Sequence, residues 1–223
     1  MAFRRAEMPG VKQFDVTEVL DRAMLLFWRR GYEGTSIDDL VRATGIGRGS
    51  LYATFHDKRR LFESVLDHYA QKIGGPLLAE LNDADPISGI QRMFAAIMKR
   101  NREHALPIGC LTTNTSLECP EIGKEISKKI ARLFASQEAA IYQTLRRAEI
   151  QRRVPRRRNI RALARFFAGT AQALNVVDKA TRDPAISEDI VRIAMSVLAQ
   201  NSRRSNGHKK RGTSISTKLR RSR

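Results

Sequence analysis

The chain has 223 residues, 42% of them apolar, which is enough for one large domain or two modest ones with a hydrophobic core. Its 41 lysines and arginines exceed its 23 acidic residues, and the formal net charge is +18. Such a surplus favours polyanions such as nucleic acid as partners. With two cysteines, no signal-peptide pattern and no apolar run long enough to span a bilayer, we expect a cytoplasmic protein that does not enter a membrane.

A first amphipathic helix is predicted near the start of the chain. Apolar residues recur every three or four positions from Val16 to Trp28, which places them in one stripe on a helix. Asp15 is suited to cap its N-terminus and Gly31 to end it. Phe27 and Trp28 belong to the apolar stripe, so we expect them to pack in the core and not against a ligand.

Short helices separated by a glycine turn are predicted next. Ser36 or Thr35 caps the second helix, since Ser36 and Asp39 have the spacing of a capping box. This helix ends at Gly45, a third helix follows the turn, and Asp57 caps a fourth. The arrangement is typical of a helix-turn-helix unit.

The remainder of the chain has helical and not strand periodicity. Helical patterns recur over 87–100, 121–150, 158–179 and 187–198. The Gly-Gly-Pro sequence at 74–76 interrupts the pattern, as either a kink or a boundary. No segment alternates with period two over a useful length, so the predicted fold is all-α. Residues 201–223 contain nine basic residues and no acidic one, and we expect a disordered basic tail because they have nothing to bury.

The third predicted helix has the chemistry of a helix that enters the major groove of DNA. Gly47, Gly49 and Ser50 are small enough for the helix start to approach DNA closely. Arg48 can pair with guanine O6 and N7, a contact worth roughly 1 to 3 kcal/mol of discrimination. Lys58 adds its charge to the positive end of the next helix, where phosphate binds. An ordinary helical hairpin with a solvated polar face is the alternative, but the turn, caps and small residues together favour DNA binding.

Several stretches of this region match a known pattern. Residues 31–36 are Gly-Tyr-Glu-Gly-Thr-Ser, residues 43–45 are Ala-Thr-Gly, and residues 49–58 are Gly-Ser-Leu-Tyr-Ala-Thr-Phe-His-Asp-Lys. They resemble the N-terminal domain of the TetR family of transcriptional regulators. The resemblance implies a helix-turn-helix DNA-binding domain at 14–63, an all-helical effector-binding and dimerisation domain at 64–200, and the basic tail at 201–223. It also implies a homodimer that binds a double-stranded DNA operator.

The same resemblance implies which residues contact DNA. Tyr52, His56 and Lys58 fall where the family contacts phosphates. Arg48, Gly49, Ser50 and Thr54 are the candidates for base edges. The whole predicted DNA-binding set is Thr35, Ser36, Gly47, Arg48, Gly49, Ser50, Tyr52, Thr54, His56 and Lys58. Gly47 stands where the family often has a serine cap, so we expect a weaker cap on this helix. Arg59 and Arg60 stand where an acidic residue is common, so we expect DNA binding to be more sensitive to salt.

The resemblance further implies a small-molecule effector bound among the later helices. An apolar lining with a few polar groups is usual for such pockets. The predicted lining residues are Phe94, Ile97, Met98, Cys110, Thr113, Asn114, Leu117, Phe134 and Phe167. Core packing is the alternative for each of them. No charged group stands out, which favours an uncharged or apolar effector.

Two apolar stripes near the C-terminus either pair between subunits in a four-helix interface or form the core of one chain. By analogy with the family, the predicted interface residues are Phe166, Thr170, Leu174, Val177, Ile190, Ile193 and Val197. A symmetric dimer would hold two recognition helices about 34 Å apart, the spacing of successive major grooves on one face of DNA.

The Gly-Cys-Leu sequence at 109–111 resembles the start of a middle helix in TetR members that respond to electrophiles or oxidants. A thiol at a helix N-terminus has a lowered pKa, so Cys110 is a candidate sensor with Cys119 as a resolving partner. A small buried apolar residue is the alternative interpretation of Cys110.

The leading interpretation is a repressor that a small-molecule effector releases from a palindromic operator. The alternative is a general architectural or nucleoid-type DNA-binding protein driven by charge, which would give no sharp palindromic footprint. We expect no enzyme, metal or cofactor, because no metal-ligand cluster, nucleophile motif or phosphate loop is visible.

Overall fold

A computed structural model describes residues 14–103, 105–118, 122–155 and 159–199. Every regular element in these ranges is a helix, which confirms the all-α prediction. The α-helices are α1 (Val16–Arg30), α2 (Ile37–Thr44), α3 (Arg48–Phe55), α4 (Lys58–Tyr69), α5 (Gly75–Ala79), α6 (Pro86–Arg102), α7 (Leu111–Leu117), α8 (Lys124–Ile150), α9 (Ile160–Thr181) and α10 (Pro184–Ala199). A π-helix η1 (Ala70–Gly74) joins α4 to α5, and a 3-10 turn η2 (Glu80–Asn82) follows α5.

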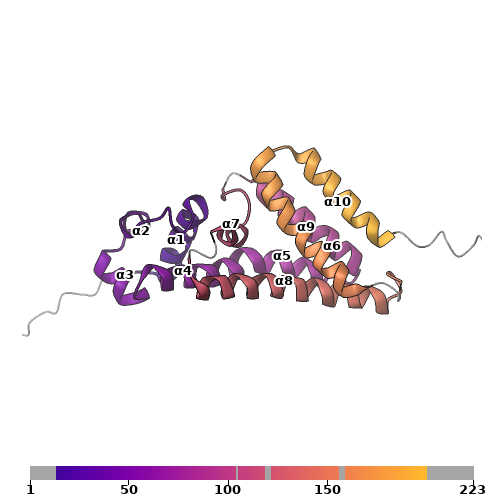
Figure 1. Cartoon of the computed structure of the whole chain (residues 1–223), viewed down its shortest axis with the longest axis horizontal. Helices are drawn as coiled ribbons and strands as arrows, with labels where there is room; N and C mark the ends of the chain where they lie inside the picture. The colour runs from indigo at the N-terminus through magenta and orange to yellow at the C-terminus, as the bar shows by residue number, and fades with distance from the viewer. Residues whose placement is uncertain (1–13, 104, 119–121, 156–158, 200–223) are drawn as a thin grey trace, which may run out of the picture.

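Local capping chemistry sets the limits of the first helices. Asp15 accepts the Thr17 backbone N–H at the start of α1, and Gly31 ends that helix. Ser36 forms the predicted capping box at the start of α2. Asp57 accepts the Arg60 backbone N–H at the start of α4. These caps confirm the predicted helix-turn-helix arrangement, with α3 at one end of the molecule (Figure 1).

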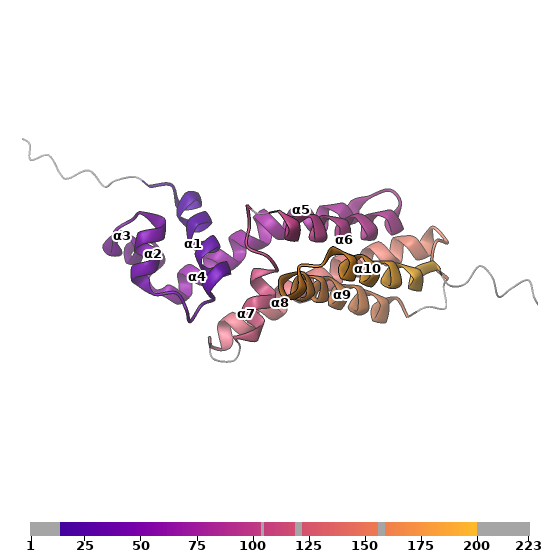
Figure 2. The same cartoon turned by 90° about the horizontal axis from the view of Figure 1, so that it is seen from above.

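The Gly-Gly-Pro sequence at 74–76 is no break in the helix. The Gly75 backbone N–H bonds to the Ala70 carbonyl five residues earlier, which is π-helical spacing. Pro76 has no N–H for an α-helical bond, and this wider turn lets the helix continue past it. Helices α4, η1 and α5 thus follow one another as a single rod from the end that holds α1 to α3 toward the C-terminal helices (Figures 1 and 2).

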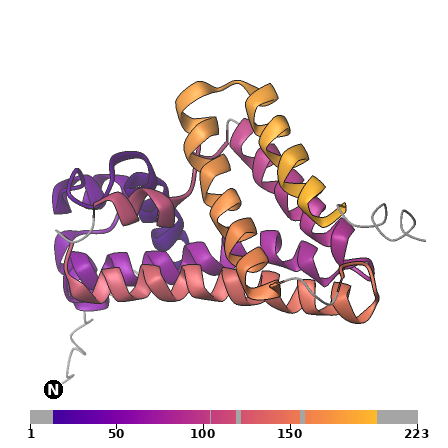
Figure 3. The ribbon, with the colours of Figure 1, turned by 45° about the vertical axis from the view of Figure 1, so that its right-hand side comes forward.

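Two hydrophobic clusters hold the helices together. The first contains the buried faces of α1 to α4, and α7 and the start of α8 also pack into it through Leu111, Ile126 and Ile130. Phe27 and Trp28 lie in this cluster with 0% and 2% exposure, as predicted. The second cluster joins α6, the later part of α8, α9 and α10, which group together in Figure 3. Helices α1 to α4 therefore share their core with segments far along the chain.

None of the helices in the described ranges is both long and apolar enough to cross a membrane. The predicted basic tail at 201–223 and Cys119 lie outside the described residues. The predicted domain limit at residue 63 falls within α4.

Candidate nucleic-acid interface and effector cavity

Helix α3 divides its residues cleanly between core and solvent. Leu51 and Phe55 are 0% and 6% exposed and anchor the helix in the first cluster. The other predicted contact residues of this segment are exposed, namely Gly47, Arg48, Gly49, Ser50, Tyr52, Thr54 and His56. The sequence therefore forms a short helix with a fixed inner face and a free polar outer face.

The glycines at the start of α3 open this outer face. A Cβ atom built on Gly47 or Gly49 would have no heavy atom of the protein within 4 Å. Glycine inside a helix is less favourable than alanine by about 0.5 to 1 kcal/mol, so packing within the protein gives no reason for Gly49. Gly47 caps α3 without a side-chain hydrogen bond. The backbone at the helix start is thus left bare for close approach by another molecule.

Arg48 is held at the start of α3 by a neighbouring helix. Its guanidinium donates to the Asp38 carboxylate of α2 at 2.5 Å, and both side chains are more than half exposed. Ser36 at the start of α2 is engaged by Asp39 of its own capping box. Hydrogen bonds from Ser36 hold the pKa of Asp39 well below its usual value, so this carboxylate stays charged.

His56 ends α3 in a strained backbone conformation. Its φ of 69° and ψ of −54° are those of a γ-turn with positive φ, and the Asp57 backbone N–H bonds to the Phe55 carbonyl at 2.9 Å across it. A residue with a side chain rarely adopts this conformation. The turn directs the chain from α3 into α4 and leaves His56 exposed beside the outer face.

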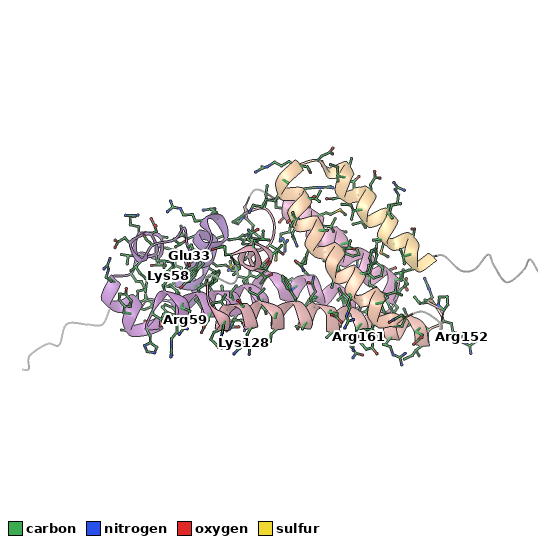
Figure 4. The ribbon with its side chains drawn as sticks, in the orientation of Figure 1. Glu33, Lys58, Arg59, Lys128, Arg152 and Arg161 are labelled. Carbon is green, nitrogen blue, oxygen red and sulfur yellow. The ribbon has the colours of Figure 1, made fainter. Side chains whose placement is uncertain are left out.

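Basic residues flank this face at the start of α4. Lys58 is half-buried, with its Nζ atom 4.2 Å from the centre of the Tyr32 ring. Lys58 and Arg59 lie at the α3 end of the molecule, whereas Arg152 and Arg161 lie at the opposite end (Figure 4). Tyr52 is 39% exposed on the same side of α3 as the free polar face.

Thr35 is a correction to the predicted DNA-binding set. Its side chain is fully buried, and its hydroxyl donates to the Gly31 carbonyl at 2.7 Å. It therefore fixes the turn between α1 and α2 and has no surface to offer DNA. Thr54 is exposed, but its hydroxyl donates to the Ser50 carbonyl of its own helix.

A cavity of about 160 Å³ lies between the α4–η1–α5 rod and helices α6 to α9. Three of the predicted lining residues, Ile97, Cys110 and Phe134, do line it. The remaining lining residues are Tyr69, Ala70, Gly74, Leu77, Leu78, Arg100, Thr112, Leu133, Ser136, Gln137, Gln172 and Asn175. The cavity thus has an apolar body, several neutral polar groups and one charged residue, Arg100.

The other predicted lining residues lie elsewhere. Thr113 is buried, and its hydroxyl donates to the side-chain oxygen of Gln172, which does line the cavity. Phe94 and Phe167 are fully buried and pack against each other in the second cluster, with ring centres 5.9 Å apart. Met98 packs on the same cluster. Asn114 accepts from Lys179. Leu117 is 77% exposed at the end of α7.

Arg100 is the residue that the sequence pattern concealed. It stands among Lys99 and Arg102 at the end of α6, where a basic run usually marks a solvated helix end. Lys99 and Arg102 do have exposed side chains, whereas Arg100 is 8% exposed. Arg100 differs from Lys99 and Arg102 only in the side of α6 on which it lies. Which side is covered by neighbouring helices depends on the tertiary structure.

Cys110 caps α7 and is buried with 7% exposure. The Tyr69 hydroxyl donates to its Sγ atom at 3.3 Å, and the Thr112 hydroxyl lies 2.8 Å away. Burial raises the pKa of the thiol, but the hydrogen bonds from Thr112, Tyr69 and Thr113 lower it by more. Across the described part of the chain, no group of three or more His, Cys, Asp or Glu side chains could hold a metal ion.

The predicted interface residues separate into three sets by exposure. Phe166 and Ile193 are 45% and 57% exposed on α9 and α10. Thr170 and Leu174 are 8% and 0% exposed, so they pack inside their own chain and are a correction to the predicted interface. Val177, Ile190 and Val197 are half-buried.

Helix α3 is short, presents a free polar face and is anchored against the buried faces of neighbouring capped helices. This arrangement is that of helix-turn-helix DNA-binding regulators. Residues 19–65 match the model of bacterial regulatory proteins of the TetR family, and residues 86–194 match that of the tetracyclin repressor-like C-terminal domain. The chain belongs to the TetR family of transcriptional regulators, which is not a family of enzymes.

Relatives along nearly the whole chain agree with this assignment. The chain is 32% identical to the transcriptional repressor ComR of Escherichia coli K12, over 84% of this chain and 89% of ComR. It is 31% identical to the uncharacterized regulator YezE of Bacillus subtilis 168, over 84% of this chain and 97% of YezE. A structure of a cysteine mutant of the TetR regulator CifR with 26 bp operator DNA has a TM-score of 0.78 and 27% identity, covering 85% of this chain and 98% of that one.

Proposed function

We propose that the protein is a homodimeric repressor that binds a palindromic operator and is released from it by a small-molecule effector. The observation that carries the proposal is the bare start of α3, where Gly47 and Gly49 leave space that no part of the protein fills. The similarity to ComR, a transcriptional repressor, and to CifR, whose structure contains operator DNA, supports it. Operator DNA lies in the bacterial cytoplasm, which we propose as the location.

In this proposal α3 enters the major groove. Arg48 and Ser50 face base edges, Gly49 permits close approach, and Tyr52, His56 and Lys58 contact phosphates. Phosphate contacts position the helix, whereas base contacts select the sequence. Arg48 already donates to Asp38, so a base would compete with this carboxylate for the guanidinium.

Exposed apolar side chains on α9 and α10 support the dimer. Phe166, Val176, Ile186 and Ile193 are large apolar residues with 39% to 57% exposure on α9 and α10. Val176 and Ile186 were not predicted from sequence. Exposed apolar groups gathered on adjacent helices mark association surfaces. We propose that a second copy covers this face and that the two α3 helices then meet successive major grooves.

The position of the cavity supports control by an effector. Ala70 and Gly74 of η1 line it, and η1 continues directly from α4, whose start follows α3. Cys110 and Thr112 of α7 also line it. A ligand that favours one arrangement of these helices shifts the population of α3 spacings and thereby operator affinity.

Selection of bound DNA from a random library, followed by footprinting, tests the proposal. The expected result is a palindrome whose half-site centres are about 10 bp apart. Arg48→Ala should relax base preference at one position of each half-site, whereas Lys58→Ala should weaken binding to all sequences alike. Binding without any enriched sequence would instead indicate the architectural protein.

A thiol sensor is the second candidate, favoured by the lowered pKa of Cys110. Operator release by an alkylating agent is measured for the wild type and for Cys110→Ser. Loss of the response in the variant supports sensing at Cys110, and an equal response in both rejects it.

A further inference from the structure

Arg100 carries a buried charge that has no acidic partner. The residue is 8% exposed and lines the cavity. Its guanidinium donates to the Asn175 side-chain oxygen at 2.5 Å, the Asn101 side-chain oxygen at 3.1 Å and the Gly109 carbonyl at 3.2 Å. All three acceptors are neutral. No Asp or Glu among the described residues forms an ion pair with Arg100, although arginine is almost never fully buried unpaired.

The same guanidinium also has an unused donor. Arg100 Nε and Trp28 Nε1 are the buried side-chain nitrogens that have no hydrogen-bond partner within the described ranges. The two side chains are neighbours, because the Arg100 guanidinium carbon lies 6.0 Å from the centre of the Trp28 ring. Buried donors are satisfied in the great majority of cases, so an unpaired one requires an explanation.

The one acid linked to this network is used by other groups. Asp178 accepts from the Asn101 side chain at 2.8 Å and from the Ser187 hydroxyl. It orients Asn101, and Asn175 in turn donates to the Ala171 carbonyl of its own helix. Asn101 and Asn175 are therefore fixed with their oxygens toward Arg100. The network holds the guanidinium in place without neutralising it.

The cavity supplies the rest of a small ligand site. Leu77, Leu78, Ile97 and Phe134 give it apolar walls, and Tyr69, Gln137 and Gln172 add neutral polar groups. A volume of about 160 Å³ suits a small molecule with a single ring or a short chain. Burial of a charge far from water costs free energy unless an opposite charge compensates it.

We propose that the cavity binds a small organic anion, with an apolar body against the walls and a carboxylate that pairs with Arg100. The proposal rests on the proposed function, in that this anion is the effector. It replaces the expectation, drawn from sequence, of an uncharged effector. Arginine is suited to the role because its planar fork binds a carboxylate through charge-assisted hydrogen bonds.

The test uses matched pairs of carboxylates and amides as probes: benzoate and benzamide, phenylacetate and phenylacetamide, hexanoate and hexanamide. Binding to the full DNA-free protein is measured by calorimetry in low-salt buffer without phosphate or sulfate. At least one carboxylate should bind about tenfold more tightly than its amide, as expected for a charge-assisted contact. Equal or better binding of every amide, or no binding by any carboxylate, would overturn the proposal.

Three variants assign the preference to Arg100. In Arg100→Gln the carboxylate preference should fall to less than about twofold, and in Arg100→Lys, which keeps the charge but loses the planar fork, an intermediate preference should remain. Arg102→Gln removes a charge from the same helix outside the cavity, where Arg102 pairs with Glu188, and should leave the preference intact. The wild-type comparison of acid with amide needs no variant, so it still decides if Arg100→Gln does not fold.

Operator binding is measured separately, so that the two proposals can fail independently. Failure to bind any selected operator without probe contradicts the proposed repressor but leaves the anion site intact. Tight carboxylate binding that leaves operator affinity unchanged retains the anion site and rejects its role as the effector site. Release of operator by the carboxylate in the wild type but not in Arg100→Gln supports both.

Discussion

The carboxylate of Glu118 accepts the backbone N–H of Tyr32 at 2.9 Å and that of Glu33 at 3.2 Å. Glu118 ends α7, whose other end carries Cys110 and Thr112 on the cavity wall. Tyr32 belongs to the turn between α1 and α2. One short helix therefore connects the cavity with the DNA-binding domain by a route that does not pass through α4.

Gly31 makes this contact possible. Its φ of 77° is unfavourable for residues with a side chain, and a Cβ atom there would lie 2.6 Å from a Glu118 carboxylate oxygen. We expect Glu118→Ala to lower the free energy of unfolding by about 1 to 3 kcal/mol, because two backbone donors lose a charged acceptor. Urea denaturation measures this. Glu125→Ala, which removes an exposed carboxylate paired with Lys128, should cost less than about 0.5 kcal/mol. Equal losses would contradict a special role for Glu118.

Gly49→Ala should separate stability from DNA binding. The new methyl group meets no protein atom, so the free energy of unfolding should rise by roughly 0.5 to 1 kcal/mol from helix propensity alone. The same methyl group stands on the free face of α3 and should weaken operator binding. Thermal denaturation and fluorescence anisotropy on the selected operator measure the two effects. Unchanged operator affinity would show that DNA does not approach this position.

His56→Gly should relieve the strain of the γ-turn. We expect a gain of about 1 kcal/mol in the free energy of unfolding, since glycine adopts positive φ without a steric penalty. His56→Ala is the matched control, because it removes the imidazole but retains the strain, and it should not stabilise. A similar gain in both variants would assign the effect to the imidazole instead. Operator affinity should fall in both if His56 contacts phosphate.

The α1–α4 contact predicts a pH dependence of stability. Asp21 accepts from His68 and Lys72, each at 2.6 Å. Burial raises the pKa of Asp21, but these hydrogen bonds and charges together lower it by more. The pKa therefore lies below its usual 3.8. A carboxyl group with a lowered folded-state pKa stabilises above its unfolded pKa, and this contribution is lost as the pH falls through the folded-state value.

Asp21→Asn should therefore flatten the loss of stability on acidification below about pH 4, at a cost of about 1 kcal/mol near neutrality. Chemical denaturation across this range measures it. Asp189→Asn removes a carboxylate whose pair with Arg192 is largely exposed, and its pH profile should match the wild type. A steeper acid dependence in Asp21→Asn than in the wild type would reverse the assigned sign.

A charge on the exposed α9–α10 face should prevent the proposed dimer. Ile193→Glu places a carboxylate at a side chain that is 57% exposed, so the monomer should keep its fold while the dimer loses apolar contact. Sedimentation velocity and circular dichroism measure assembly and folding. Leu117→Glu, at an apolar residue that is 77% exposed and far from this face in the sequence, is the control. A dimer that persists in Ile193→Glu would place the interface elsewhere.

Local chemistry made the DNA-binding domain predictable from sequence. Ser36 and Asp57 cap helices through neighbours three residues away, and Leu51 and Phe55 anchor α3 through helical periodicity. These features depend on short-range spacing. The family resemblance then indicated which residues of α3 to propose as DNA contacts.

The cavity could not be predicted in the same way. Phe94 and Phe167 are of a residue type that often lines pockets, yet they pack on each other in the core. Leu174 follows the same apolar stripe as Phe166, but faces its own chain. Arg100 has the sequence environment of a solvated residue. In each case the outcome depends on which helix covers which face, and sequence periodicity specifies faces without specifying their neighbours.

The ion pair between Arg48 and Asp38 bears on how well bases are discriminated. In the proposed complex, Arg48 at a wrong base is not left without an acceptor, because it can return to Asp38. A mismatch at that position then costs only the difference between a guanine and a carboxylate as partner. If Arg48 reads a base as proposed, Asp38 is an internal competitor that softens selectivity, and we expect several related operator sequences to be bound instead of one strict sequence.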